Sequence, residues 1–326
     1  MSYVLVTGGA GFIGANLCRE LLKRGESVIC ADNYCTGSYA NVSALSGKGD
    51  FKAVEADITD PAFERIVAAA AGIRGIKRIY HLACPASPVH YQKDPIMTAR
   101  TCFEGSLNVL KLARDNGARV LLASTSEVYG DPLEHPQKES YRGNVNPDGP
   151  RACYDEGKRI AETLFFDAKR KWNVDIRVVR IFNTYGPFMA VSDGRVVSNF
   201  INQALKGKPL TIYGDGLQTR SFMYVADLIR GLLGMMEQTV SSGPVNLGNP
   251  EEHTMLEAAE MVKMVTGSAS ELVFEPLPQD DPTRRRPDIT LARELFGFSP
   301  STSFFEGLKK TCEYFHNLAM DIDFQS

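Results

Sequence analysis

The sequence has few histidines, no paired cysteine motif and no long apolar run. Seven cysteines are scattered through the 326 residues without a C-x-x-C pair, and the five histidines are equally dispersed. We therefore expect neither a disulfide framework nor a metal site, and the thiols indicate a reducing compartment. No apolar run approaches the roughly 20 residues of a membrane-spanning helix, and no signal peptide precedes the first apolar run. A cytoplasmic protein without a membrane partner is expected.

The sequence also lacks a large excess of either acidic or basic residues, because the net formal charge is only −3. A chain that binds nucleic acid through a broad surface would carry an excess of basic residues. The one local exception is the run Arg284-Arg285-Arg286. Nucleic acid is therefore not an expected partner.

Apolar runs and helical patterns alternate over the first 181 residues. Strands are predicted at residues 4–6, 28–31, 51–54, 78–82, 120–123 and 176–181. Helices are predicted at residues 15–24, 98–115 and 154–171. The alternation predicts an α/β fold with a Rossmann-type, doubly wound parallel sheet. Beyond residue 181, proline, glycine and short elements dominate, so we predict a domain over residues 1–181 and a smaller C-terminal lobe over residues 182–326, with a boundary that the chain can cross.

Glycines at positions 8, 11 and 14 stand between a predicted strand and a predicted helix. Gly8 permits a tight turn, Gly11 lets backbone N–H groups approach a pyrophosphate, and Gly14 lets the helix pack closely on the strand. Asp32 ends the next strand, 18 residues after Gly14. A carboxylate there accepts hydrogen bonds from a ribose diol and repels a 2′-phosphate, which predicts NAD rather than NADP. The alternative is a structural glycine turn with a helix-capping aspartate.

Tyr154 and Lys158 are spaced to lie on one face of a predicted helix. A tyrosine acts as a base near neutral pH only when its pKa is lowered from about 10. A nearby lysine and a cationic nicotinamide do this by stabilising the phenolate. Residues 124–127 (STSE) end a predicted strand, so their hydroxyl groups are expected at the carboxyl edge of the sheet. Alone, the Tyr-x-x-x-Lys spacing also fits a surface helix pair, but together with the glycine turn and Asp32 it predicts redox chemistry.

These residues resemble the extended short-chain dehydrogenase/reductase family over essentially the whole chain, and within it the UDP-glucuronate decarboxylases, also called UDP-xylose synthases. The strings that carry the resemblance are residues 81–88 (HLACPASP), 122–131 (LASTSEVYGD), 149–159 (GPRACYDEGKR), 194–200 (GRVVSNF), 219–222 (TRSF), 245–253 (VNLGNPEEH) and 280–289 (DDPTRRRPDI). The resemblance implies that residues 1–181 bind NAD and that residues 182–326 mainly bind a sugar nucleotide.

The resemblance implies decarboxylation of UDP-glucuronate. Tyr154, helped by Thr125 and Lys158, would take the proton of the sugar 4-hydroxyl while C4 passes a hydride to NAD⁺. The 4-ketone is β to the C6 carboxylate, so CO₂ is lost, and protonation at C5 followed by hydride return gives UDP-xylose. Glu127 is implied in acid/base work or carboxylate repulsion near C5 and C6. Arg220 is implied in proton delivery or carboxylate placement.

Ser126 distinguishes this activity from related ones. Related 4,6-dehydratases carry Asp where this chain has Ser126, and that Asp expels the C6 hydroxyl group as water. A second carboxylate would repel glucuronate by roughly 1–4 kcal/mol near contact. Epimerases of the family generally lack Glu127. The Ser126-Glu127 pair therefore favours a decarboxylase, with a 4-epimerase, a 4,6-dehydratase or a non-catalytic NAD-binding scaffold as the alternatives.

The expected contacts gather at the glycine turn, the strand ends and the second lobe. The cofactor contacts are Gly8, Gly11, Phe12, Ile13, Gly14, Asp32, Asn33, Thr36, Gly37, Asp57, Ile58, Leu82, Ala83, Tyr154 and Lys158. The substrate contacts are Ser126, Asn183, Arg195, Asn199, Thr211, Tyr213, Arg220 and Arg286. Asp57 is expected at the adenine or as a turn residue, and Tyr213 against uracil or in the core. Arg286 represents the 284–286 run, of which we expect one side chain at the diphosphate.

Four positions depart from the family pattern. Relatives usually carry Arg and His where this chain has Phe188 and Ala190, and Met97 and Cys102 replace residues that are often Lys and Asn. Release of UDP-4-keto-xylose, alone or mixed with UDP-xylose, is therefore an open outcome.

The helices predicted at residues 98–115 and 154–171 carry apolar residues beyond one stripe. A helix that is apolar on more than one side needs burial on two sides. In the family such helices pair across a dimer, so we predict a homodimer, with burial against the sheet as the alternative.

Overall fold

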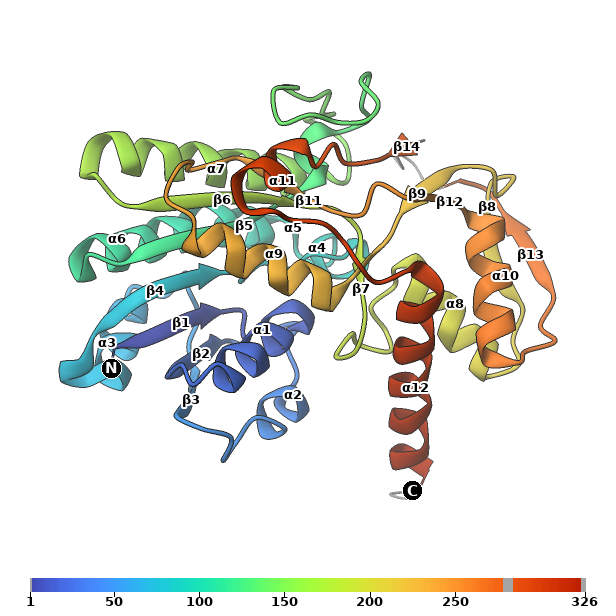
Figure 1. Ribbon diagram of the computed structural model, residues 1–326, viewed down its shortest axis with the longest axis horizontal. Coiled ribbons are helices and arrows are strands. Elements are labelled where there is room, and N and C mark those ends of the chain that lie inside the picture. The colour runs from blue at the N-terminus through green and yellow to red at the C-terminus, as the bar shows by residue number, and fades with distance from the viewer. Residues whose placement is uncertain (1, 278–283, 324–326) are drawn as a thin grey trace.

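The computed structural model describes residues 2–277 and 284–323, and it contains a seven-stranded parallel sheet (Figure 1). The strand order is β11-β6-β5-β4-β1-β2-β3. The strands are β1 (Tyr3–Thr7), β2 (Val28–Asp32), β3 (Phe51–Glu55), β4 (Ile76–His81), β5 (Arg119–Thr125), β6 (Ile176–Ile181) and β11 (Val245–Leu247). The predicted Rossmann-type α/β fold is confirmed. The strand order reverses between β1 and β4, which is where doubly wound sheets bind their ligands.

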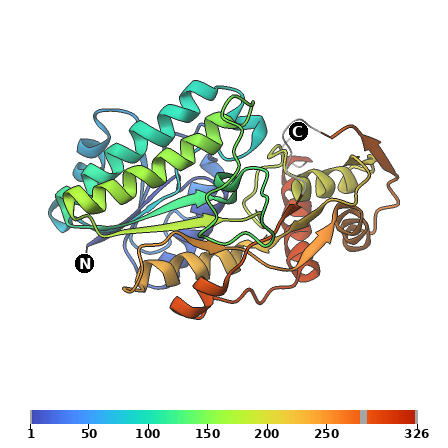
Figure 2. The same cartoon turned by 90° about the horizontal axis from the view of Figure 1, so that it is seen from above.

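Helices cover both faces of the sheet (Figure 2). One face carries α3 (Phe63–Ala71), α6 (Ser106–Asn116) and α7 (Ala152–Trp172). The other carries α1 (Phe12–Lys23), α9 (Val225–Glu237) and α11 (Thr290–Phe296). Alternate residues of β1 pack against opposite helix layers. Leu5 packs in the hydrophobic cluster with α3, α6 and α7, while Val4 and Val6 pack in the cluster with α1 and α9. This alternation is the side-chain period of a strand buried on both faces.

The helix predicted over residues 98–115 is interrupted in the structure. α5 (Pro95–Arg100) passes into α6 through a π-helical turn, η2 (Thr101–Gly105). Gly105 packs so closely that a Cβ atom there would lie 2.3 Å from Cδ1 of Ile58. Such turns insert one extra residue and are frequent near functional sites. In contrast, the helix predicted over residues 154–171 is the unbroken helix α7.

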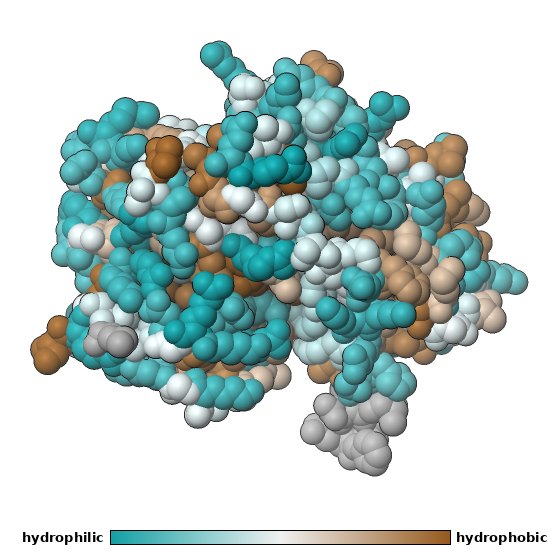
Figure 3. All heavy atoms as spheres, in the orientation of Figure 1, coloured by the Kyte–Doolittle hydropathy of each residue, from teal (hydrophilic) through white to brown (hydrophobic). Residues whose placement is uncertain are grey.

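The second lobe consists of short strands around three helices. The strands are β7 (Thr184–Tyr185), β8 (Leu210–Tyr213), β9 (Thr219–Ser221), β10 (Met223–Tyr224), β12 (Glu252–Thr254), β13 (Leu272–Glu275) and β14 (Arg284–Arg285). The helices are α8 (Val196–Leu205), α10 (Met255–Thr266) and α12 (Phe304–Asp323). Figure 3 shows mainly hydrophilic side chains on one face of the molecule, with apolar side chains gathered over this lobe.

The chain crosses between the two lobes. β11 lies beyond residue 181, yet it pairs in parallel with β6 and completes the sheet. α9 also packs on the sheet layer, against α1. The crossing that the prediction allowed is therefore present, and the assignment of residues 1–181 and 182–326 as separate domains stays a prediction.

Candidate active site

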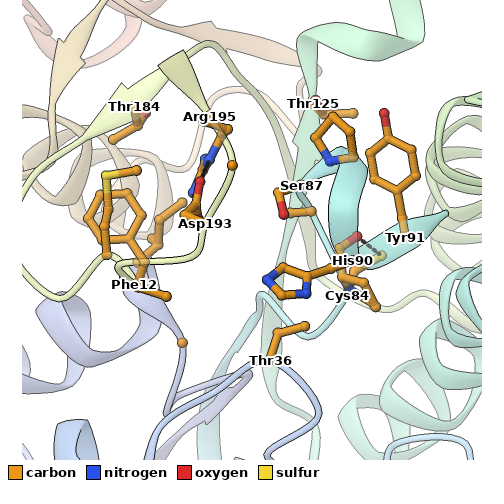
Figure 4. A pocket seen from close by; sticks show the side chains of 18 of the residues that line it. Phe12, Thr36, Cys84, Ser87, His90, Tyr91, Thr125, Thr184, Asp193 and Arg195 are labelled. Atoms are coloured by element: carbon orange, nitrogen blue, oxygen red, sulfur yellow. Dashed lines mark hydrogen bonds and ion pairs between the residues drawn. The ribbon is translucent and has the colours of Figure 1, made fainter. Parts of the chain in front are cut away.

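A cavity of about 870 Å³ lies between the carboxyl edge of the sheet and the second lobe. Its wall combines the glycine turn, the ends of β2, β4 and β5, the start of α7, and residues of α8 and β8. Figure 4 shows Ser87, His90 and Tyr91 on one side of it and Asp193 and Arg195 on the other. The cavity is thus at the reversal of strand order, as the fold dictates.

The glycine turn has no space for side chains at Gly8 and Gly14, and its open side faces the cavity, where a phosphate group could approach the backbone. Gly8 has a φ of +73°, and a Cβ there would lie 2.8 Å from the backbone of Ala83. A Cβ at Gly14 would lie 2.1 Å from the carbonyl oxygen of Gly8. A Cβ at Gly11 would meet only that same oxygen, at 3.3 Å, because its other side faces the cavity. This arrangement fits the pyrophosphate of a dinucleotide at the start of α1.

Asp32 ends β2 at the cavity wall, where its carboxylate accepts hydrogen bonds from Ala10 N at 2.9 Å and Tyr34 N at 2.8 Å. Burial raises its pKa above the ordinary value, although these hydrogen bonds oppose the shift. Asp57 accepts a hydrogen bond at 2.8 Å from the amide of Asn33, which joins two expected contacts. Both carboxylates therefore stand where a ribose or an adenine would be recognised.

Nearly all expected cofactor residues meet in this cavity. Those that line it are Gly8, Gly11, Phe12, Ile13, Gly14, Asp32, Asn33, Thr36, Asp57, Ile58, Leu82, Ala83, Tyr154 and Lys158. Gly37 does not line it, because it packs behind Asp32, and a Cβ there would lie 2.9 Å from Asp32 Oδ1.

Tyr154 and Lys158 face the end of β5 from α7. Lys158 is buried and its Nζ donates a hydrogen bond at 3.0 Å to the carbonyl oxygen of Ala123. The same Nζ lies 5.9 Å from the centre of the Tyr154 ring. Burial and then the Cys84 thiol raise the pKa of Tyr154 well above its ordinary value, against a hydrogen bond with Thr125. The predicted lowering of the Tyr154 pKa is therefore wrong for the protein alone, because burial raises that pKa.

Glu127 is clamped between two arginines that sequence reasoning did not select. Its carboxylate receives hydrogen bonds from Arg151 Nη2 at 2.6 Å and from Arg285 Nη2 at 2.8 Å, with a second bond from Arg285 Nη1. Burial alone would raise the pKa of Glu127, but the charges of Arg285 and Arg151 lower it to about 2. Glu127 is thus an ionised group with fixed partners.

The structure places Arg285, not Arg286, at the cavity wall. Arg285 is buried in β14, while Arg286 is directed outward, with Nη1 3.6 Å from a carboxylate oxygen of Glu252. Successive side chains of a strand point in opposite directions. That alternation was the signal by which one arginine of the run could have been separated from its neighbours. Residues 280–283 of the string at 280–289 lie outside the described residues.

The other expected substrate residues all line the cavity. They are Ser126, Asn183, Arg195, Asn199, Thr211, Tyr213 and Arg220. Arg195 is paired with Asp193, Nη2 to Oδ2 at 2.8 Å, and its guanidinium lies 5.7 Å from the Phe12 ring centre. Tyr213 is 41% exposed, so the alternative of a core tyrosine is wrong. Arg220 is buried and its Nη1 donates to the carbonyl oxygen of Thr219.

Two hydroxyl groups at the cavity were not anticipated. The Tyr91 ring stacks on the Tyr154 ring, with centres 5.0 Å apart and planes 3° apart. Ser87 precedes α4 (Pro88–Tyr91) on the same side (Figure 4). Within the described parts of the chain, neither hydroxyl oxygen has a hydrogen-bond partner, although both side chains are buried. Buried hydroxyl groups without partners are costly, and both residues line the cavity, although the two oxygen atoms themselves are buried.

Three of the four departures from the family pattern reach the cavity. Met97, Phe188 and Ala190 line it, whereas Cys102 is buried beneath α7. Phe188 has a φ of +72° and packs on Tyr314, with ring centres 5.6 Å apart.

No group of three or more metal-ligating side chains occurs in residues 2–277 and 284–323. Over the same ranges, no helix is both long enough and apolar enough to cross a membrane.

Fold and cavity together define a Rossmann-fold enzyme with a Tyr/Lys pair beside a dinucleotide site. The chain belongs to the NAD dependent epimerase/dehydratase family, which it matches over residues 4–248. This confirms both the family resemblance and NAD as the cofactor.

The chain is also similar to individual members of this family, both in sequence and in solved structures. The chain is 51% identical to UDP-glucuronic acid decarboxylase 1 of Arabidopsis thaliana over 98% of its own length and 71% of that protein. It is 52% identical to UDP-glucuronic acid decarboxylase 1 of Danio rerio, over 96% of this chain and 72% of the relative. Among solved structures, UDP-glucuronic acid 4-epimerase from Bacillus cereus, in complex with UDP-glucuronic acid and NAD, superposes with a TM-score of 0.86 at 28% identity, covering 97% of this chain and 99% of that one.

Proposed function

We propose that this protein is an enzyme that decarboxylates UDP-glucuronate with NAD as a recycled cofactor. The observation that carries the proposal is Glu127, held ionised between Arg151 and Arg285 and directly after Ser126 at the end of β5. The relatives that are 51% and 52% identical and are named UDP-glucuronic acid decarboxylases support the same substrate and reaction.

NAD would be held by the glycine turn of residues 8–14, by Asp32 and by Asp57. When bound, it accepts a hydride from sugar C4 and later returns it. The chain's own contribution at this step is the phenol of Tyr154, which would take the proton of the sugar 4-hydroxyl. Thr125 supports the phenolate by its hydrogen bond, and Lys158 adds positive charge close to the ring.

Oxidation at C4 makes a ketone β to the C6 carboxylate, and loss of CO₂ leaves an enolate. We assign Glu127 an electrostatic role, because a carboxyl group with a pKa of about 2 is a poor proton donor near neutral pH. Glu127 would hold the guanidinium groups of Arg151 and Arg285 in fixed positions at the cavity wall, where their positive charge can place the substrate carboxylate before CO₂ departs. Arg151 and Arg285 keep the local charge balanced. Arg220, buried at the wall, would place the substrate.

The alternatives on this scaffold fit the site less well. A 4,6-dehydratase needs an acid that expels the C6 hydroxyl, and Ser126 and the ionised Glu127 supply none at the end of β5. A 4-epimerase has no need of the fixed charges around Glu127. A non-catalytic scaffold has no need of the buried Lys158 and Tyr154.

The products would be UDP-xylose, UDP-4-keto-xylose or both. Phe188, Ala190 and Met97 line the cavity where relatives usually carry other residues, so these positions would govern how long the keto intermediate is retained. Chromatography of the sugar nucleotides formed from UDP-glucuronate and, separately, from UDP-glucose tests the assignment. The proposal predicts pentose products from the first and none from the second. An epimerised or dehydrated hexose as the main product would refute it.

We further propose a homodimer formed through the outer side of α5, η2 and α7. Ile96, Phe103 and Ile160 are exposed there by 71%, 43% and 38%. The helices adjoin one another, and a second copy presenting the same side would bury these residues symmetrically.

A cytoplasmic location is also proposed, supported by seven free cysteines, and a fluorescent fusion in the source cell tests it.

A further inference from the structure

Two cysteines that are 18 residues apart in the chain meet beside the catalytic helix. Cys84 follows β4 in the loop that lines the cavity, and Cys102 belongs to the π-helical turn η2. Their Sγ atoms lie 3.3 Å apart. A disulfide bond has an S–S distance of about 2.05 Å. An approach of little more than 1 Å would therefore join them.

The two thiols differ in access. Cys102 is buried, and its Sγ would lie 3.0 Å from a Cβ at Gly157, so η2 packs directly on α7 between Tyr154 and Lys158. Cys84 is half-buried and faces the cavity, where a small solute can reach it. The hydrogen bond with Cys102 lowers the pKa of Cys84 to about 7, against the effect of burial. Cys84 therefore has the thiolate character that oxidation requires.

We propose that Cys84 and Cys102 form an oxidation site at which hydrogen peroxide produces a reversible disulfide that slows turnover. The Cys84 thiolate attacks a peroxide oxygen, the O–O bond breaks, and Cys84 becomes a sulfenic acid while water leaves after protonation. The Cys102 sulfur then attacks the Cys84 sulfur, the S–O bond breaks, and the Cys102 proton leaves with the hydroxide as a second water. Two thiols are oxidised and one peroxide is reduced.

The tight contact of η2 with α7 determines which side moves. Because Cys102 already touches the backbone of α7 at Gly157, most of the approach has to come from the loop of Cys84. That loop also carries Leu82 and Ala83, which line the cofactor end of the cavity, and Ala83 touches Gly8. A displacement of about 1 Å at reacting groups costs on the order of 100-fold in rate. We expect the oxidised protein to retain a tenth or less of its turnover.

Other cysteines near the glycine turn and α7 lack the features that make Cys84 and Cys102 an oxidation site. Cys18 shares a hydrogen bond with Cys30 beneath the glycine turn, but both are fully buried, away from the cavity. Cys153 lies on α7 close by, with its Sγ 3.6 Å from the carbonyl oxygen of Tyr91. Neither arrangement offers an accessible thiolate next to a second thiol.

The test treats the NAD-loaded protein with dilute hydrogen peroxide, followed by intact mass, peptide mapping and turnover before and after dithiothreitol. We expect a loss of about 2 Da, a Cys84–Cys102 cross-link, and a loss of turnover that the reductant restores. Cys102→Ser should keep basal turnover and form no cross-link, and peroxide should instead carry its Cys84 on to the sulfinic acid, with a loss of turnover that dithiothreitol does not restore. Cys153→Ser, the matched control, should stay sensitive. A cross-link at Cys18–Cys30, no cross-link, or a loss of turnover that dithiothreitol restores equally in Cys102→Ser would overturn the proposal.

The turnover readout rests on the decarboxylase function proposed above, whereas the cross-link does not. If the protein released no CO₂ before treatment but formed the Cys84–Cys102 bond, the functional proposal would fail and the oxidation site would stand.

Discussion

At the scale of single residues, the surroundings of two adjacent arginines decide their roles. Arg285 donates two hydrogen bonds to Glu127, while Arg286 does not line the cavity and lies beside the carboxylate of Glu252. The sequence run predicts that one arginine acts on the substrate but does not indicate which. Alternation along the strand separates Arg285 from its two neighbours, but only the register of β14 against β9 shows which side of the strand meets the cavity.

Arg285→Gln should lower turnover about 100-fold or more, because Glu127 loses a buried bidentate partner. Its pKa should rise from about 2, since Arg285 is the larger of the two charges that lower it. The acid limb of the pH–rate profile should therefore move to higher pH. Arg286→Gln is the matched control and should change turnover less than about threefold. Equal losses in the two variants would contradict the assignment.

Asp155 is expected to make the free energy of unfolding depend on pH. Burial, and then the charge of Glu127, raises its pKa from 3.8 to about 7. The folded protein thus binds more protons than the unfolded chain between these values, so stability present at low pH is lost as pH rises through 7. Asp155→Asn should therefore raise the unfolding free energy by about 2 kcal/mol more at pH 8 than at pH 5. Denaturant titrations of both proteins measure this, and a gain that is independent of pH would refute it.

At the scale of elements, the regular segments were predictable and the irregular one was not. Strands β1 to β6 and helix α7 match their predicted ranges closely because apolar periodicity continues through each of them. The π-helical turn η2 was missed because it depends on Gly105 packing against Ile58, a contact between segments far apart in the chain. The same turn brings Cys102 to Cys84, which explains why that pair could not be foreseen either.

A substitution at Gly14 tests whether the first turn of α1 is needed for NAD binding. A Cβ at this position would lie 2.1 Å from the carbonyl oxygen of Gly8, so Gly14→Ala has to displace the glycine turn. We expect the dissociation constant for NAD to rise at least about tenfold and stability to fall by about 1–3 kcal/mol. Glu20→Ala, on the exposed side of the same helix, should alter neither. Calorimetric titration with NAD makes the comparison, and unchanged affinity in Gly14→Ala would contradict the model of the turn.

At the scale of the whole molecule, the cavity is formed by parts that the sequence separates widely. The sheet edge, α7 and β14 meet only because the chain returns after residue 181, adding β11 to the sheet and then β14 beside β9. The family resemblance predicts part of the cavity wall, and nearly all of the site residues that it predicts do line that wall. It does not predict the clamp on Glu127, since Arg285 lies 158 positions from it.

The proposed dimer makes a prediction at this scale. Phe103→Glu places a charge on the exposed apolar side of η2 and should convert a dimer into a monomer, since burying an unpaired charge is strongly unfavourable. Ile73→Glu is the control, because Ile73 is equally apolar and fully exposed on a different side of the molecule. Sedimentation velocity of the three proteins measures the outcome. A monomeric parent protein, or a dimer that survives Phe103→Glu, would contradict the proposed interface.

The most direct measurement of the central claim is the release of CO₂ from UDP-glucuronate labelled at C6. With NAD present at a lower concentration than UDP-glucuronate, the account predicts many labelled CO₂ molecules for each NAD where UDP-xylose is the product, because hydride return regenerates the cofactor. Where UDP-4-keto-xylose is released, it predicts one labelled CO₂ for each NAD. Tyr154→Phe should bind NAD normally and release almost none. Folded protein that binds NAD but releases no labelled CO₂ would contradict the account.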